Sequence, residues 1–173
     1  KCNVDLIVMG SKGTSGLEEM LVGSNTEKVV RNSEIPVMVI KQEFTEFKIK
    51  NIVFASNFKI KNRVAFQNIL DFSKIFGAKL HLLKINTIHN FETTKKSSDA
   101  IRNYINGFDL EDYSLNIYND ESIEAGVLNF SKAIDADAIL LNTHKRRGLA
   151  HLFTGSISKD LANHAKLPVL TFK

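Results

Sequence analysis

The sequence predicts an α/β fold in which a five-stranded parallel open sheet carries helices on both faces, joined to a strand–helix–strand remnant of a second copy of the same fold. Short apolar runs alternate with amphipathic stretches along the 173 residues, and this alternation favours parallel strands connected by right-handed helical crossovers. The end of the chain also repeats its beginning, which indicates that one supersecondary unit occurs twice.

The internal repeat has a period of 132 residues, and the chain's only two prolines form one of its nine identical pairs. The pairs are Asp5/Asp137, Ile7/Ile139, Gly16/Gly148, Leu17/Leu149, Gly23/Gly155, Ser24/Ser156, Pro36/Pro168, Val37/Val169 and Lys41/Lys173. Strand and helix signals fill residues 48–135 ahead of the second occurrence, whereas only a few residues precede the first. We therefore expect residues 1–42 to be the C-terminal remnant of a first domain, residues 43–47 to be a linker and residues 48–173 to be a complete domain.

The first occurrence is predicted to contain a strand, a loop, a helix and a second strand. Residues 5–9 form an apolar run typical of a strand buried on both faces. Ser24 is followed three residues later by Glu27, a capping-box pattern, so we expect a helix to begin there. Residues 36–40 predict the next strand, with Pro36 at its first position, where a missing N–H is tolerated.

The remainder is predicted to supply five strands and four helices. The expected strands cover residues 51–55, 79–85, 114–118, 138–141 and 169–172, and the expected helices cover residues 64–76, 95–106, 123–134 and 156–165. Gly77 is expected to end the first of these helices as a C-cap. Phe66, Phe72 and Phe76 recur at helical spacing, so we expect them in the core.

Composition and charge exclude several classes of protein. No apolar run approaches the roughly 18 residues that a membrane span requires. The single cysteine, Cys2, excludes an intrachain disulfide and favours a reducing, cytoplasmic compartment. The formal net charge of +4, with acids and bases mixed, does not indicate nucleic acid. The basic stretch at residues 144–147 contains no aromatic side chains for stacking bases, so nucleic acid is an unlikely partner.

No catalytic or metal site is expected. The five histidines have no metal-ligand spacing. The chain also shows no serine elbow, no paired-carboxylate signature and no Walker lysine loop, because Lys12 is not followed by Ser or Thr.

One loop does indicate ligand binding. Gly10 and Gly13 are separated by two residues, and Gly23 follows after nine more and is succeeded by Ser24. Glycines let the backbone N–H groups approach phosphate oxygens, and a helix N-terminus adds unpaired N–H groups and the positive end of its dipole. In an open α/β sheet such a loop lies at the carboxyl ends of the strands, where ligands bind. The structural alternative is that the glycines serve only turn geometry and Ser24 only caps the helix.

This loop resembles the ATP-binding signature of the universal stress protein family: Gly, two residues, Gly, nine residues, then Gly followed by Ser or Thr. The resemblance covers nearly the whole chain. It implies an adenine nucleotide alpha hydrolase-like fold and a tandem protein, with the last third of a first domain followed by a complete second domain. ATP, with Mg²⁺, is the ligand that the resemblance implies, bound through Gly10, Gly13, Gly23 and Ser24.

The complete domain departs from the family pattern. Asn142 and Lys145 replace the first two glycines, whereas Gly155 and Ser156 remain. Asn57 stands where ATP-binding relatives usually carry an aspartate associated with the nucleoside. Its site is therefore degenerate, and the intact loop belongs to the first domain of the parent protein.

The leading expectation is a non-catalytic stress-response protein with adenine nucleotide as a regulatory ligand. Two alternatives remain open: a scaffold or dimerisation module that needs no nucleotide, and a slow ATPase. The resemblance further implies that the last strands of the two domains pair antiparallel, so that Val37–Ile40 and Val169–Phe172 join the copies in a pseudo-dimer. The open side of the remnant is expected to favour self-association.

Overall fold

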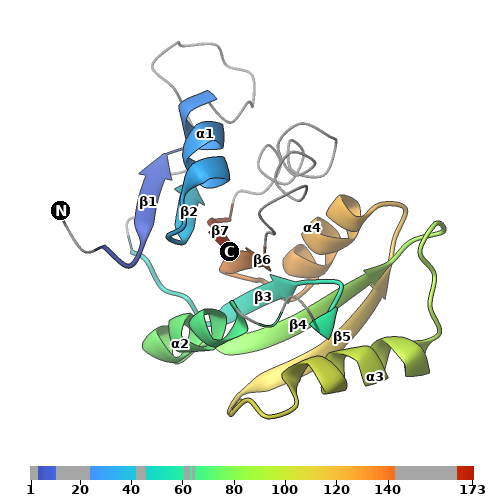
Figure 1. Ribbon diagram of the computed structural model, residues 1–173. Coiled ribbons are helices and arrows are strands. Elements are labelled where there is room, and N and C mark those ends of the chain that lie inside the picture. The colour runs from blue at the N-terminus through green and yellow to red at the C-terminus, as the bar shows by residue number, and fades with distance from the viewer. Residues whose placement is uncertain (1–3, 11–23, 42–45, 61–62, 64, 143–166) are drawn as a thin grey trace.

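A computed structural model describes the chain over residues 4–10, 24–41, 46–60, 63, 65–142 and 167–173. Its strands are β1 (Ile7–Gly10), β2 (Val37–Ile40), β3 (Asn51–Ala55), β4 (Lys79–Asn86), β5 (Tyr113–Asn119), β6 (Ala138–Asn142) and β7 (Val169–Phe172). Its helices are α1 (Ser24–Asn32), α2 (Phe66–Phe76), α3 (Thr94–Ile105) and α4 (Ile123–Ala133). Each described element corresponds to a predicted one, and the predicted helix 156–165 lies outside the described residues (Figure 1).

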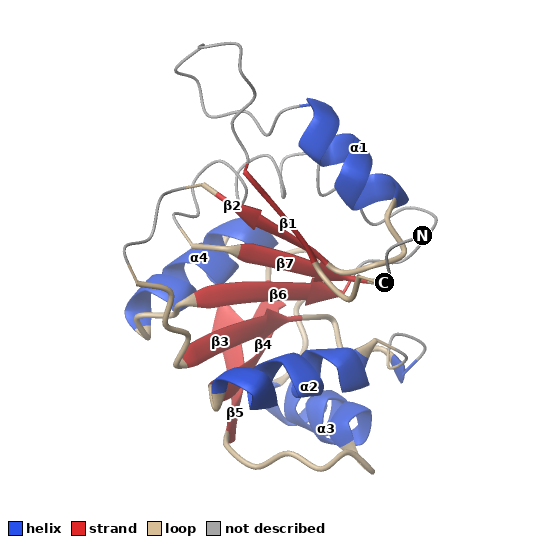
Figure 2. Ribbon diagram, turned by 90° about the vertical axis from the view of Figure 1, so that its left-hand side faces the viewer, coloured by secondary structure: helices blue, strands red, loops and turns tan. Residues whose placement is uncertain are grey.

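The seven strands form one sheet in the order β1-β2-β7-β6-β3-β4-β5, which can be followed in Figure 2. The strands from β7 to β5 are mutually parallel, as predicted for the complete domain. β2 runs antiparallel to β7, with Val37 opposite Thr171 and Val39 opposite Val169, and β1 runs parallel to β2. The expected antiparallel pairing of the two last strands is therefore present within the chain, and it makes the first copy of the repeat (residues 4–41) an extension of the same sheet.

Helices cover both faces of the sheet. α2 and α3 pack on one face, where their buried side chains form a cluster with Ile52, Phe54 and Leu140 of the strands. α4 packs on the opposite face, which α1 also covers farther along the sheet. Figure 1 shows these pairs of helices on opposite sides of the strands. Since strand side chains alternate between faces, successive residues of β3 and β6 enter different clusters.

Three described helices have identifiable caps, and the predicted Gly77 cap is one of them. α2 ends at Gly77, whose φ of 58° is left-handed and whose N–H donates to the carbonyl of Lys74. Thr93 and Ser122 cap α3 and α4 by accepting hydrogen bonds from backbone N–H groups. The Ser24 and Glu27 side chains, which were predicted to form a capping box, lie outside the described part.

The phenylalanines of α2 lie in or beside the core, and one of them contacts the segment predicted to be a linker. Phe66 and Phe72 are buried as predicted, and Phe76 is partly buried at the edge of the same cluster. Phe47, at the end of the predicted linker, packs its ring against Phe76 with centroids 6.1 Å apart. None of the helices that the structure describes is long and apolar enough to cross a membrane.

Candidate functional site

Of the predicted ligand-binding residues, Gly10 and Asn57 lie at or just after the carboxyl ends of β1 and β3, and the first copy of the repeat is described on both sides of its glycine-rich loop. Gly10 ends β1, and α1 begins at Ser24. The Thr26 hydroxyl, in the first turn of α1, donates to the Gly10 carbonyl at 3.1 Å. This bond holds the N-terminus of α1 beside the end of β1. Gly13 and Gly23 lie outside the described residues.

Gly10 is exposed, and no other described residue packs against its Cα. A methyl group added at its Cα would have no described atom within 4 Å, and its φ is not in the left-handed region. Neither packing nor backbone geometry among the described residues therefore requires glycine at this position. The space in front of Gly10 is compatible with the close approach of a phosphate group to the backbone.

The second copy of the repeat (residues 136–173) has a different arrangement at the same position. Asn142 ends β6 and, by strand alternation, lies on the same face as the fully buried Ala138 and Leu140. Its side chain is hydrogen-bonded to the buried Tyr104 of α3. Burial raises the pKa of Tyr104 to about 12, against the lowering effects of the Asn142 hydrogen bond and the nearby Arg63. Asn142 is thus anchored to the core. Lys145, Gly155 and Ser156 lie outside the described part.

The turn after β3 carries Asn57. The Ser56 hydroxyl oxygen accepts the N–H of Phe58 at 3.1 Å, and Asn57 Oδ1 accepts the N–H of Lys59 at 3.2 Å. Phe58 adopts a left-handed φ of 51° and is buried, with its ring 5.8 Å from that of Phe54. Because a phenylalanine is rarely found in this conformation, the hydrogen bonds and the ring packing hold a strained turn. Asn57 is exposed in this turn.

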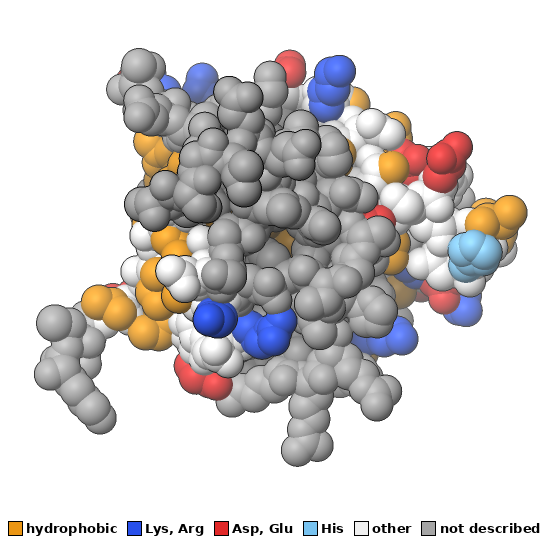
Figure 3. All heavy atoms as spheres, turned by 90° about the horizontal axis from the view of Figure 1, so that it is seen from above, with side chains coloured by type: hydrophobic (Ala, Val, Ile, Leu, Met, Phe, Trp, Pro, Cys, Tyr) orange, Lys and Arg blue, Asp and Glu red, His pale blue; other side chains and the backbone are white. Residues whose placement is uncertain are grey.

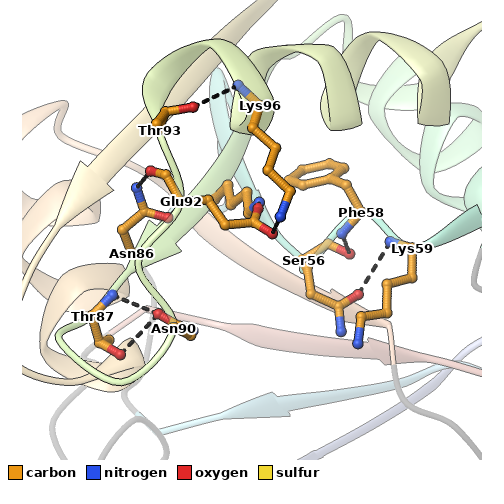
Figure 4. Close-up of polar contacts among 11 residues, drawn as sticks. Ser56, Phe58, Lys59, Asn86, Thr87, Asn90, Glu92, Thr93 and Lys96 are labelled. Carbon is orange, nitrogen blue, oxygen red and sulfur yellow. Dashed lines mark hydrogen bonds and ion pairs between the residues drawn. The ribbon is translucent and has the colours of Figure 1, made fainter.

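A polar network that the sequence did not predict joins the end of β4 to the loop that follows it. Lys84, buried within β4, forms an ion pair with the partly exposed Glu92 of the β4–α3 loop, and Lys96 of α3 pairs with the same carboxylate at 3.0 Å. Asn86 donates to the Glu92 carbonyl at 2.9 Å. Figure 4 shows the Glu92 side chain extending toward the turn that carries Ser56 and Phe58. The only sequence signal is that Lys84 follows the apolar pair Leu82 and Leu83 within a strand, and its partner lies in a loop without periodicity.

Charge elsewhere is mixed. In Figure 3 the basic and acidic side chains of the described residues are interspersed. Among the described residues, no group of three or more His, Cys, Asp or Glu side chains is placed to hold a metal ion. His81 has a structural role: its Nδ1 is 2.9 Å from the Ser114 hydroxyl and its Nε2 is 3.2 Å from Asn51 Oδ1. Burial, followed by the nearby Lys79, lowers the pKa of His81, with Asp112 acting in the opposite direction.

Comparison with known proteins assigns a family to this architecture. The model of the universal stress protein family matches residues 1–41 and 118–173, together more than half of the chain. Universal stress protein Slr1230 of Synechocystis sp. is 24% identical over 181 residues, which cover 100% of this chain and 59% of that protein. The chain thus spans less than two thirds of the length of this relative.

Solved structures share the fold. A universal stress protein from Archaeoglobus fulgidus matches with a TM-score of 0.74 at 20% identity, covering 98% of this chain and 60% of that one. A universal stress protein in complex with cAMP matches with a TM-score of 0.53 at 12% identity, covering 73% of this chain and 98% of that one. The glycine spacing, the sheet order and the family match agree, and the chain belongs to the universal stress protein family.

Proposed function

We propose that this chain belongs to a non-catalytic stress-response protein that binds an adenine nucleotide as a regulatory ligand at the glycine-rich loop of the first copy. The observation that carries the proposal is the hydrogen bond from Thr26 to the Gly10 carbonyl, because it holds a helix N-terminus beside an open strand end. A helix N-terminus in this position favours phosphate oxygens. The existence of a family member in complex with cAMP supports an adenine nucleotide as the ligand class.

In this proposal the phosphates contact backbone N–H groups of Gly13 and Gly23, and the Ser24 hydroxyl donates to one of them. Mg-ATP is the proposed form of the ligand, with Mg²⁺ neutralising part of the phosphate charge. The second copy is not the proposed site, since Asn142 fills its strand end with a side chain that is tied to Tyr104. Asn57, Gly155 and Ser156 are the residues that would border a nucleotide in this degenerate second site.

A second candidate is a nucleotide-independent scaffold. The antiparallel pairing of β2 with β7 favours it, because this pairing joins the two copies without a ligand. We propose that the pairing reproduces in one chain the interface of a pseudo-dimer, with residues 1–42, 43–47 and 48–173 as remnant, linker and complete domain. A slow ATPase is a third candidate, although we assign no general base. The single Cys2 supports a cytoplasmic location.

Calorimetric titration with Mg-ATP tests the leading proposal. We expect saturable binding that Gly13→Val weakens by at least about tenfold, or roughly 1.4 kcal/mol, because a branched side chain would block the phosphate. The repeat supplies the control: Lys145→Val, at the equivalent position of the second copy, should leave the affinity unchanged. Equal affinities in all three proteins would place the ligand elsewhere, and a lack of binding would favour the scaffold.

A further inference from the structure

One buried lysine belongs to neither copy of the repeat. Lys84 lies in β4 and is 7% exposed, with Leu82 and Leu83 fully buried before it. An ammonium group in such surroundings is strongly destabilising unless an anion accompanies it. An anion must therefore neutralise Lys84 in the folded protein.

Glu92 supplies that anion from outside the strand. Its side chain is 29% exposed, and its carboxylate contacts both Lys84 and Lys96. Hydrogen bonds from Lys84, and then from Lys96, lower the pKa of Glu92, so this carboxylate stays ionised. Two ammonium groups thus surround one negative charge, which leaves the cluster with an excess positive charge.

The cluster lies where ligands of open α/β sheets bind. Lys84 and Asn86 belong to the last residues of β4, and the Glu92 side chain reaches toward the turn after β3 (Figure 4). Asn86 is also buried, and its Oδ1 has no hydrogen-bond donor among the described residues. An acceptor without a donor suits a ligand that carries a hydroxyl group, as a monoprotonated phosphate does.

We propose that Lys84 and Lys96 form an anion site for a phosphate group, and that the Glu92 carboxylate occupies this site until a phosphate-bearing ligand displaces it. A phosphate carries more charge than a carboxylate and three acceptor oxygens, so it bridges two ammonium groups more effectively. The site shares no residue with the glycine-rich loop and does not depend on nucleotide binding there. Because Glu92 is partly exposed in a surface loop, its replacement requires no opening of the core.

Thermal unfolding of Glu92→Gln with and without inorganic pyrophosphate tests this site, with NaCl used to match ionic strength. Without the anion we expect a lower Tm than in the unsubstituted protein, since Lys84 loses its neutralising charge. Saturating pyrophosphate should then raise the Tm of the variant by at least about 5 °C, and should raise that of the unsubstituted protein much less. If the variant is unfolded without anions, recovery of its native circular dichroism in pyrophosphate is the equivalent result.

A surface carboxylate provides the matched control. Asp99 also lies beside two cations, 2.8 Å from Lys95 and 4.0 Å from Arg102, but its side chain is 45% exposed. Asp99→Asn changes the net charge equally and should show no pyrophosphate response. Lys84→Met combined with Glu92→Gln should also lose the response, because one of the two ammonium groups is absent.

The outcomes separate the possible ligands. An unresponsive Glu92→Gln, or equal responses in Glu92→Gln and Asp99→Asn, would overturn the proposal. AMP titrated in parallel with pyrophosphate distinguishes a nucleotide from a free phosphate compound: a response to both identifies a phosphate site, and a stronger response to AMP identifies the phosphate of a nucleotide. Both titrations are repeated in the Glu92→Gln/Gly13→Val double variant, in which the proposed loop site is blocked. A response retained there belongs to the Lys84 site, and a response lost there belongs to the glycine-rich loop, so failure of this site and failure of the loop proposal remain distinguishable.

Discussion

Among the described residues, the two copies of the repeat differ in the burial of their first strands. β6 lies between β7 and β3, and its Leu140 is 0% exposed. β1 is the edge strand of the sheet, and Val8, the equivalent of Leu140, is 55% exposed. The two strands share an apolar pattern, yet only one is covered on both sides. The comparison shows that the pattern specifies a strand, whereas its burial depends on neighbours contributed by distant segments.

The residues that end these two strands also differ in their contacts. Gly10, at the end of β1, has no described atom within 4 Å of an added methyl group, whereas Asn142 at the end of β6 is hydrogen-bonded to Tyr104 in the core. Among the described residues, the copy with the more exposed first strand thus also has the strand end with fewer contacts. We infer that the second copy contributes more to stability than the first, and the following substitutions at equivalent positions test that difference.

The largest difference is expected between Leu140→Ala and Val8→Ala. Removing a fully buried leucine side chain leaves a cavity and should lower the free energy of unfolding by about 2–5 kcal/mol. The same truncation at an exposed valine should change it by less than about 1 kcal/mol. Urea denaturation of both variants measures the difference. Similar losses in the two variants would mean that β1 is covered as fully as β6 in solution.

A smaller difference is expected at the aspartates that precede these strands. Asp137 Oδ2 accepts the backbone N–H groups of Lys50 and Asn51 at 2.7 and 2.8 Å, which ties the start of β3 to β6. Asp137→Ala should lower the free energy of unfolding by about 1–3 kcal/mol. Asp5, the repeat equivalent, is exposed, so Asp5→Ala should stay within about 0.5 kcal/mol. Chemical denaturation would contradict this contrast if the Asp5 variant lost as much.

The smallest changes in the free energy of unfolding are expected at Lys41 and Lys173, the last residues of the two copies. The two changes should have opposite signs. Lys173 Nζ donates to the Arg31 carbonyl near the C-terminus of α1 at 2.8 Å, so Lys173→Met should lower the free energy of unfolding by about 1 kcal/mol. Burial lowers the pKa of Lys41 from 10.5 to about 8. At pH 7, below this pKa, Lys41 is still mostly charged in the folded state. Its burial therefore costs stability, and Lys41→Met should be stabilising.

The pH dependence distinguishes this explanation from a simple gain in apolar contact. Between pH 8 and 10.5 the folded chain has released the Lys41 proton while the unfolded chain still retains it. The stability of the unsubstituted protein should consequently rise with pH in this window, and the advantage of Lys41→Met should shrink. Thermal melts at pH 7 and pH 10 measure the change. An advantage that is equal at both pH values would contradict a desolvation origin.

Much of the fold could be predicted because its signals are local or repeated. Gly77 ended α2 as expected, and the resemblance correctly implied that Val37–Ile40 would pair antiparallel with Val169–Phe172. The polar groups of the site could not be predicted in this way. Lys84 and Glu92 come from a strand and from a loop, and Tyr104 and Asn142 are separated by several elements, so no periodicity relates them.

The sequence by itself determined the type and order of the elements, because hydrophobic periodicity, glycine and capping residues act within a few positions along the chain. It also determined the family, through glycine spacing and the repeat. The tertiary structure decided which of two similar strands became buried, since strand neighbours are assembled from distant segments. It likewise decided that Lys84 meets Glu92, because the buried charge is tolerated only where the fold brings a carboxylate to it.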